Sequence, residues 1–270
     1  MAPDAHPAPP HGFADAFVAG VLDAALAHPT RVLGLSGLQG SGKSTLAAQL
    51  VDAAAARGIT AVALSLDDVY LDLPDRRQLA RGVHPLLATR GPPGTHDVAL
   101  ACATLDALRA GGPVRLPAFD KLGDRRLPEE RWREVRDVGL VVFEGWCLGT
   151  PPEPAAALAE PVNALERDED RDCRWRRWCN DALARDYPAL WQRIDQLLFL
   201  QPPGFDVVPT WRWQQEQSMQ AHDPRRRGMA RAQLDRFVQH YERVSRQALR
   251  TLPAIADTVV RLDAARRPID

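Results

Sequence analysis

Short apolar runs alternate along the chain with longer segments whose apolar residues recur at helical spacing. The runs are rich in Val, Leu and Phe, which is typical of strands buried on both faces. At least one plausible helix separates each run from the next, so the pattern predicts an α/β fold: a parallel sheet with helices on both faces. The predicted strands are RVLGLSG (31–37), TAVALSLDD (60–68), GLVVFEGW (139–146), QLLFLQPP (196–203) and DTVVRLD (257–263).

The ends of the chain give further expectations. Residues 1–12 are rich in proline and alanine without periodicity, which predicts a disordered lead-in. Apolar residues from Phe13 to Leu22 recur at helical spacing, so a helix should precede the first strand, and residues 234–248 form a second amphipathic pattern that we interpret as core packing. No linker divides the sequence, and we expect one domain over residues 13–270.

The segment 166–191 contains RWRRW, which could be taken for a basic, aromatic nucleic-acid site. A salt-bridged surface helix is the better interpretation. Trp175, Trp178, Cys179 and Ala182 fall on one helical face. The pairs Asp170–Arg174 and Asp172–Arg176 have the (i, i+4) spacing of exposed ion pairs.

Composition narrows the possible partners. A formal net charge of -1 gives no general field for nucleic acid or an anionic membrane, and no run reaches the length of a membrane helix. The four cysteines form no CxxC pair and no signal-peptide pattern precedes them, so we expect reduced thiols and a cytoplasmic protein. The oligomeric state stays open. Arginine replaces lysine almost everywhere, and only Lys43 and Lys121 remain.

Lys43 belongs to GLQGSGKST (37–45), which fits the phosphate-binding pattern G-x-x-x-x-G-K-[ST] between a predicted strand and a predicted helix. Glycines there let backbone N–H groups approach phosphate oxygens, and the helix N-terminus adds partial positive charge. Lys43 should hold the β- and γ-phosphates of ATP, and the hydroxyl of Ser44 should ligate Mg²⁺. The predicted nucleotide-binding residues are Gly37, Gln39, Gly40, Ser41, Gly42, Lys43, Ser44 and Thr45.

Carboxylates follow two predicted strands at the sheet edge where α/β proteins carry their chemistry. Asp67 and Asp68 end the second strand, and Glu144 ends the third. A carboxylate facing the γ-phosphate can ligate Mg²⁺ or accept the proton of an attacking hydroxyl. We expect Asp67 and Glu144 to join Ser44 at the metal, although turn carboxylates at strand ends are an alternative, especially for Asp68.

Several motifs in this order resemble those of the plant-type D-glycerate 3-kinases and their bacterial and fungal relatives. These proteins lie within the group of P-loop kinases that includes phosphoribulokinase, uridine kinase and pantothenate kinase. The resemblance covers nearly the whole chain, from about residue 31 to residue 268. The motifs are SGLQGSGKST, SLDDVYL, RGPPGTHD, LPAFDKLGDRR, VVFEGW and WRWQQE.

The resemblance implies roles for single residues. It makes Asp67 the catalytic base, places Tyr70 beside the acceptor pocket and puts His96 and Asp97 of GTHD on the acceptor side. Trp211 begins a helical lid in which Arg212 could stabilise the transferred charge as an arginine finger does. A packed lid helix is the alternative for Arg212.

The same resemblance places Lys121, in a D-K-x-x-D-R motif, next to the acceptor, where a compact ammonium suits a small anionic hydroxy acid. A solvent-facing loop lysine is the alternative. Ala118 occupies a position where many members carry arginine, so Arg90, Arg125 or Arg126 could provide the missing charge. We expect Arg90 to bind substrate together with Lys121.

The phosphate-binding motif predicts a P-loop NTPase fold, and the resemblance implies an enzyme that transfers the γ-phosphoryl group of MgATP to a hydroxyl of a small anionic acceptor, D-glycerate in the first place. The alternatives are a kinase for a nucleoside or pantothenate-like alcohol, and a non-catalytic ATP-binding regulatory or assembly protein. The acceptor motifs argue against the non-catalytic alternative, because a switch needs no base, acceptor site and lid together.

Overall fold

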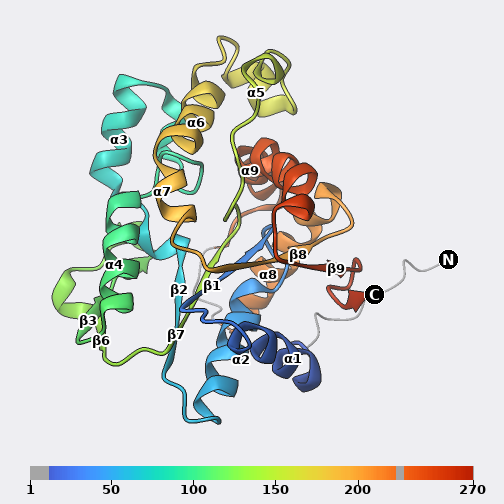
Figure 1. Cartoon of the computed structure of the whole chain (residues 1–270). Coiled ribbons are helices and arrows are strands. Elements are labelled where there is room, and N and C mark those ends of the chain that lie inside the picture. Colours follow the sequence, from blue (N-terminus) through green and yellow to red (C-terminus); the bar gives the residue numbers. More distant parts are fainter. Residues whose placement is uncertain (1–11, 223–227, 270) are drawn as a thin grey trace.

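A six-stranded sheet in the order β10-β9-β8-β1-β7-β2 forms the centre of the computed structural model, which describes residues 12–222 and 228–269 (Figure 1). All neighbouring strands are parallel except β9 and β10, which are antiparallel. The predicted lead-in lies outside the described residues apart from Gly12. The strands are β1 (Val32–Gly37), β2 (Ala61–Ser65), β7 (Leu140–Gly145), β8 (Gln196–Gln201), β9 (Thr258–Leu262) and β10 (Pro268–Ile269).

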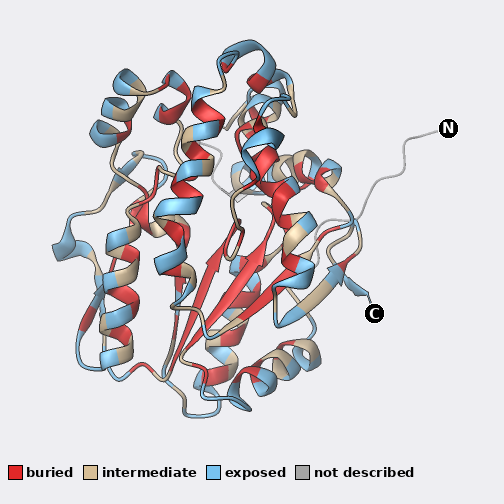
Figure 2. Ribbon diagram, turned by 45° about the horizontal axis from the view of Figure 1, so that its top comes forward, coloured by how far each residue is buried: buried red, intermediate tan, exposed pale blue. Residues whose placement is uncertain are grey.

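The central strands β1, β7 and β8 are buried on both faces, which explains why they read as continuous apolar runs (Figure 2). Side chains alternate along β7: Val141 and Phe143 belong to one core cluster, whereas Leu140 and Val142 belong to the other. Helices α1 and α2 supply the second cluster, and α4, α7 and α9 supply the first. The ranges are α1 (Asp15–Leu26), α2 (Lys43–Ala55), α4 (Val98–Ala110), α7 (Tyr187–Trp191) and α9 (Arg231–Thr251).

The remaining elements surround the carboxyl ends of the strands or extend from the sheet. None of the helices in the described part of the chain is long and apolar enough to cross a membrane. The helices are α3 (Leu73–Gly82), α5 (Ala164–Glu169), α6 (Arg174–Arg185) and α8 (Val208–His222), and the small strands are β3 (Val114–Leu116), β4 (Phe119–Asp120), β5 (Arg125–Arg126) and β6 (Arg133–Val135). The 3-10 turns are η1 (Leu66–Val69), η2 (Pro85–Ala88), η3 (Glu129–Arg131), η4 (Ala155–Leu158), η5 (Phe205–Val207) and η6 (Leu252–Ala254).

The five predicted strands are confirmed as β1, β2, β7, β8 and β9, and the two predicted amphipathic helices as α1 and α9. The interpretation of segment 166–191 is only partly right. Trp175, Cys179 and Ala182 are buried on one face of α6, as expected. The predicted exposed ion pairs are wrong, because Cys173 adopts a left-handed conformation that separates α5 from α6, and both Asp170 and Arg176 are buried.

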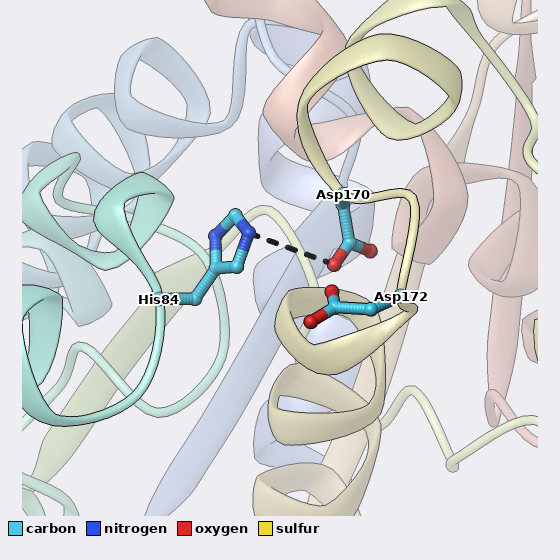
Figure 3. Close-up of side chains that lie close together, drawn as sticks. All are labelled: His84, Asp170 and Asp172. Atoms are coloured by element: carbon cyan, nitrogen blue, oxygen red, sulfur yellow. Dashed lines mark ion pairs between the residues drawn. The ribbon is translucent and has the colours of Figure 1, made fainter.

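Asp170 and Asp172 meet His84 in a cluster that has the composition of a metal site (Figure 3). Local structure explains it instead. Asp170 accepts hydrogen bonds from the backbone N–H groups of Trp175 and Arg176 at the start of α6. Nδ1 of His84 accepts from the N–H of Leu86, which leaves Nε2 facing an oxygen of Asp170 at 3.8 Å. The carboxylate of Asp170 and Nδ1 of His84 therefore already cap α6 and η2, and Oδ1 of Asp172 accepts from the N–H of Arg174 at 3.3 Å.

Candidate active site

The loop between β1 and α2 has the conformation that phosphate binding needs. Gly40 and Gly42 have φ values of 79° and 93°, which lie in the left-handed region favoured by glycine. A Cβ on Gly40 would also come within 2.7 Å of the Cβ of Trp211. Helix α2 begins at Lys43, so the backbone N–H groups of the loop and the positive end of the helix dipole lie at one point.

Three polar side chains surround this point. Nζ of Lys43 is buried and donates to the carbonyl of Leu38, 3.0 Å away. Burial lowers the pKa of Lys43, while the nearby carboxylates of Glu144 and Asp67 oppose that effect. The hydroxyl of Ser44 donates to Oε1 of Glu144 at 2.9 Å. The structure thus brings the predicted phosphate and metal ligands of β1, α2, β2 and β7 to the same edge of the sheet.

A cleft of about 540 Å³ opens next to the loop. Lys43, Ser44 and Glu144 line one part of it, and Asp67 and Lys121 line another. Its further lining residues among those predicted from the sequence are Gln39, Gly40, Tyr70, Arg90 and Arg212.

Asp67 follows β2 in the turn η1, and both of its oxygens have partners. The hydroxyl of Tyr70 donates to Oδ1 at 2.5 Å, and Nζ of Lys121 donates to Oδ2 at 2.6 Å. Burial alone would raise the pKa of Asp67, but the Lys121 charge and these hydrogen bonds lower it to about 2. Asp67 is therefore a carboxylate throughout the neutral range.

The neighbouring Asp68 has a different role. Its Oδ2 accepts from the backbone N–H of Ser65 at 3.0 Å and so completes a capping box on η1. Burial raises its pKa to about 6. Asp68 does not line the cleft.

Tyr70 is held in place by aromatic packing. Its ring stacks on His96 and meets the edge of Phe119, with centroid distances of 5.1 and 5.3 Å. Nδ1 of His96 lies 2.6 Å from the hydroxyl of Tyr187, and burial lowers the pKa of His96 to about 4, so the ring is neutral. His96 thus supports the cleft from behind Tyr70 instead of lining it.

Asp97 also lies outside the cleft lining. Its Oδ1 accepts from the N–H of Leu100 and caps α4, and its Oδ2 pairs with Arg126 at 3.0 Å. Arg126 additionally donates to the carbonyl of Tyr70. Asp97 and Arg126 therefore hold the Tyr70 segment against the β4–β5 hairpin.

Of the three arginines considered beside Ala118, only Arg90 lines the cleft. Nη1 of Arg90 donates to Oδ1 of Asp124 at 2.6 Å, and its guanidinium lies 5.7 Å from the ring centre of Phe119. Arg125 instead points towards Asp120 on the exposed outer side of the hairpin. Arg90 and Lys121 are thus the cations that face the cleft beside Asp67.

Asp124 is a residue whose role the sequence did not reveal. It accepts hydrogen bonds from both Arg90 and the fully buried Arg76, and its φ is 52°. This double contact fixes the loop that carries Lys121. Its position in the D-K-x-x-D-R motif was the available signal.

Arg212 lies in α8 and faces the cleft, where its positive charge contributes to lowering the pKa of Lys43. Its Nη1 donates to Oε1 of Gln215 in the next turn of the helix. The preceding Trp211 is buried and donates from Nε1 to the carbonyl of Ala264 at 2.8 Å. The predicted lid therefore begins with a packed tryptophan and an arginine turned towards the phosphate loop.

A second hollow of about 260 Å³ lies on the other side of the phosphate loop. Thr45, the last of the predicted nucleotide-binding residues, lines it together with Phe13, Gln214 and Arg266. The guanidinium of Arg266 stacks on Trp211 at 4.9 Å and donates to the carbonyl of Gly40 at 2.6 Å. The ring of Phe13 and the planar cation of Arg266 in its lining make this hollow suitable for a nucleotide base.

Helix α9 was interpreted from sequence as core packing, yet Phe237 and Tyr241 line the main cleft. The hydroxyl of Tyr241 donates to the carbonyl of Arg90 at 2.8 Å. An amphipathic pattern does not distinguish a side chain that packs inside the core from one that lies at the edge of the core. In the sequence, only the polar hydroxyl of Tyr241 indicated a position at the edge.

Known proteins that are similar to this chain in structure and in sequence agree with this geometry. D-glycerate 3-kinase from Cryptococcus neoformans superimposes with a TM-score of 0.75 at 27% identity, covering 95% of this chain and 96% of that one. The uncharacterized kinase mug58 of Schizosaccharomyces pombe is 36% identical over 227 residues, which are 78% of each protein. The chain belongs to the family of P-loop kinases that includes D-glycerate 3-kinase.

The chloroplastic D-glycerate 3-kinase of Arabidopsis thaliana is 29% identical over 262 residues, or 89% of this chain, but the match spans only 54% of the plant protein. No family model matches the chain. The predicted fold class is confirmed: this kinase has the α/β P-loop fold and is a phosphotransferase that acts on a small molecule with an alcohol group.

Proposed function

We propose that this kinase transfers the γ-phosphoryl group of ATP to a hydroxyl of D-glycerate and forms 3-phosphoglycerate. The observation that carries the proposal is the pairing of Asp67 with Lys121, with Arg90 lining the same cleft as the phosphate loop. A small carboxylate buried without a partner would cost several kcal/mol, so an acidic acceptor needs cations at this place. The names of the Cryptococcus and Arabidopsis relatives support the same acceptor.

Each residue has a defined task in the proposed reaction. Lys43 and the N–H groups of the loop hold the phosphates of ATP. Asp67 accepts the proton of the acceptor hydroxyl while that oxygen bonds to the γ-phosphorus, and the bond from the γ-phosphorus to the bridging oxygen breaks to release ADP. Arg212 stabilises the negative charge on the transferring group.

Magnesium fits the residues present. The hydroxyl of Ser44 and the carboxylate of Glu144 lie 2.9 Å apart, and Asp67 lines the same cleft, so the donor set consists of the oxygen atoms that this hard cation prefers. When bound, the ion would neutralise charge on the β- and γ-phosphates. The four cysteines are unpaired, which suits the reducing cytoplasm that we propose as the location.

A substrate screen tests the proposal. The purified protein is incubated with ATP, Mg²⁺ and one acceptor at a time from a panel of D-glycerate, L-glycerate, other small hydroxy acids, nucleosides and pantothenate-like alcohols, and ADP is measured. We expect D-glycerate to give the largest kcat/KM, and phosphorus NMR of the product to show phosphate on the 3-hydroxyl. Phosphorylation of a neutral alcohol but not of D-glycerate would refute the acceptor, and ATP binding without any acceptor-dependent ADP would refute catalysis.

A further inference from the structure

Asp67 already accepts a short hydrogen bond on each of its two oxygens, and as a base it must also offer a lone pair to the acceptor hydroxyl. Its Oδ1 accepts from Tyr70 and its Oδ2 from Lys121, at 2.5 and 2.6 Å. An acceptor hydroxyl has to come within about 3 Å of one of these oxygens before it can pass its proton. Each oxygen keeps a second lone pair, and the departure of one partner would give the hydroxyl an unobstructed and more strongly basic oxygen.

The two partners differ in their freedom to move. Tyr70 is only 4% exposed and is packed against His96 and Phe119. The side chain of Lys121, in contrast, is 55% exposed and extends from the loop between β4 and β5. The backbone of this loop is fixed by Asp124, so Lys121 can swing while its attachment point stays in place. Lys121 is thus the partner that can leave.

We propose that Lys121 is a substrate-operated gate: it covers Oδ2 of Asp67 in the ligand-free protein and leaves it for the carboxylate of the acceptor. This inference rests on the proposed function, because it requires an acidic acceptor. Arg90 lines the same cleft and receives the other side of that carboxylate. Lys121 therefore leaves Asp67 only when the acceptor carries a negative charge.

The surroundings of Asp67 favour such an exchange. Glu144 from β7 and Asp68 from η1 add negative charge, and Lys43 from α2 is committed to the phosphate loop. His96 behind Tyr70 is neutral. Lys121 is therefore the one mobile cation against Asp67 among residues 12–222 and 228–269, and a second carboxylate in the cleft competes with Asp67 for it.

A neutral acceptor cannot make this exchange. Glycerol has the shape of D-glycerate with a hydroxymethyl group in place of the carboxylate, so it would leave Lys121 on Asp67. The enzyme then discriminates between the two acceptors in turnover as well as in binding. A lysine that merely binds the carboxylate would affect D-glycerate alone.

The kinetic test compares Lys121→Met with the wild-type protein on both acceptors. Loss of a charge-assisted contact should lower kcat/KM for D-glycerate by about 10- to 10³-fold. Removal of the gate should raise kcat for glycerol about three- to tenfold, the scale of a half-exposed ion pair. Arg125→Met is the matched control, since it removes a cation of the same loop that lies outside the cleft, and it should change neither value.

A spectroscopic test uses the fact that the chain has only two lysines. The protein is labelled with ¹⁵N-lysine, and the Lys121 signal is assigned by its loss in Lys121→Met. In the ligand-free state the Lys121 signal should differ between wild type and Asp67→Asn. With D-glycerate and a non-hydrolysable ATP analogue bound, we expect this difference to shrink, because Lys121 then pairs with the substrate in both proteins.

The outcomes separate the gate from the proposed function. If the wild-type protein forms no ADP with D-glycerate, the proposed function fails and the gate fails with it. If it does form ADP but glycerol turnover does not rise in Lys121→Met, Lys121 only binds substrate and the gate is wrong. An undiminished effect of Asp67→Asn on the Lys121 signal in the ternary complex would also overturn it.

Discussion

Replacement of Asp67 by asparagine isolates the chemistry of the base, because the amide keeps the shape of the carboxylate and loses its charge and basicity. Oδ1 of asparagine can still accept from Tyr70, whose hydroxyl lies 2.5 Å from Oδ1 of Asp67. The side chain can no longer take a proton from the acceptor hydroxyl. We expect turnover to fall by about 10²- to 10⁴-fold, the usual contribution of a positioned general base, while ATP affinity stays the same.

The same substitution should change stability only slightly. The pKa of Asp67 is lowered from 3.8 to about 2, so its ion pair with Lys121 stabilises the fold above pH 3.8 and is lost as pH falls through about 2. The full shift corresponds to roughly 2.5 kcal/mol. Because the Lys121 side chain is 55% exposed, solvent screening reduces the expected loss in Asp67→Asn to about 1 kcal/mol at pH 7.

An ADP-coupled assay at saturating MgATP and acceptor measures the turnover, calorimetric titration measures ATP binding, and urea denaturation measures the free energy of unfolding. Asp68→Asn is the control, since Asp68 caps Ser65 outside the cleft, and it should retain turnover close to wild type. Normal turnover in Asp67→Asn together with an inactive Asp68→Asn would show that the wrong aspartate had been chosen.

Three further substitutions test other parts of the site. Lys43→Met should abolish phosphoryl transfer and weaken ATP binding while circular dichroism shows a retained fold; wild-type ATP affinity and turnover would contradict the phosphate-loop assignment. Glu144→Gln should raise the Mg²⁺ concentration needed for half-maximal activity, and an unchanged magnesium titration would remove Glu144 from the metal site. Asp124→Ala leaves Arg76 buried without its carboxylate partner and frees Arg90, so we expect about 1–3 kcal/mol less stability in urea and a raised KM for the acceptor; full stability would mean that the loop is fixed by other contacts.

The sequence by itself determined the sheet and the phosphate loop. Both depend on residues close together in the chain: an apolar run flanked by helices gives a strand buried on two faces, and GLQGSGKST carries its glycines, lysine and serine within nine residues. Asp67 and Glu144 could be anticipated because parallel strands end at one edge of the sheet.

Only the tertiary structure decided the acceptor side. The cleft combines side chains from η1, the β4–β5 hairpin, α8 and α9, and the order of these segments in the chain does not say which side chains face one another. His96 and Asp97 share one motif with Arg90, yet Arg90 lines the cleft whereas His96 and Asp97 support it from outside.

The interpretation of the arginine-rich segment 166–191 was partly wrong for the same reason. Helical spacing predicted the exposed pairs Asp170–Arg174 and Asp172–Arg176, but a left-handed Cys173 separates α5 from α6, and Asp170 and Arg176 are both buried. Periodicity describes a continuous helix, and it cannot detect a cap formed inside the pattern by buried charges. The contact between Lys121 and Asp67 likewise joins residues 54 positions apart. Such contacts depend on how separate elements pack, because charges find their partners in space and not along the chain.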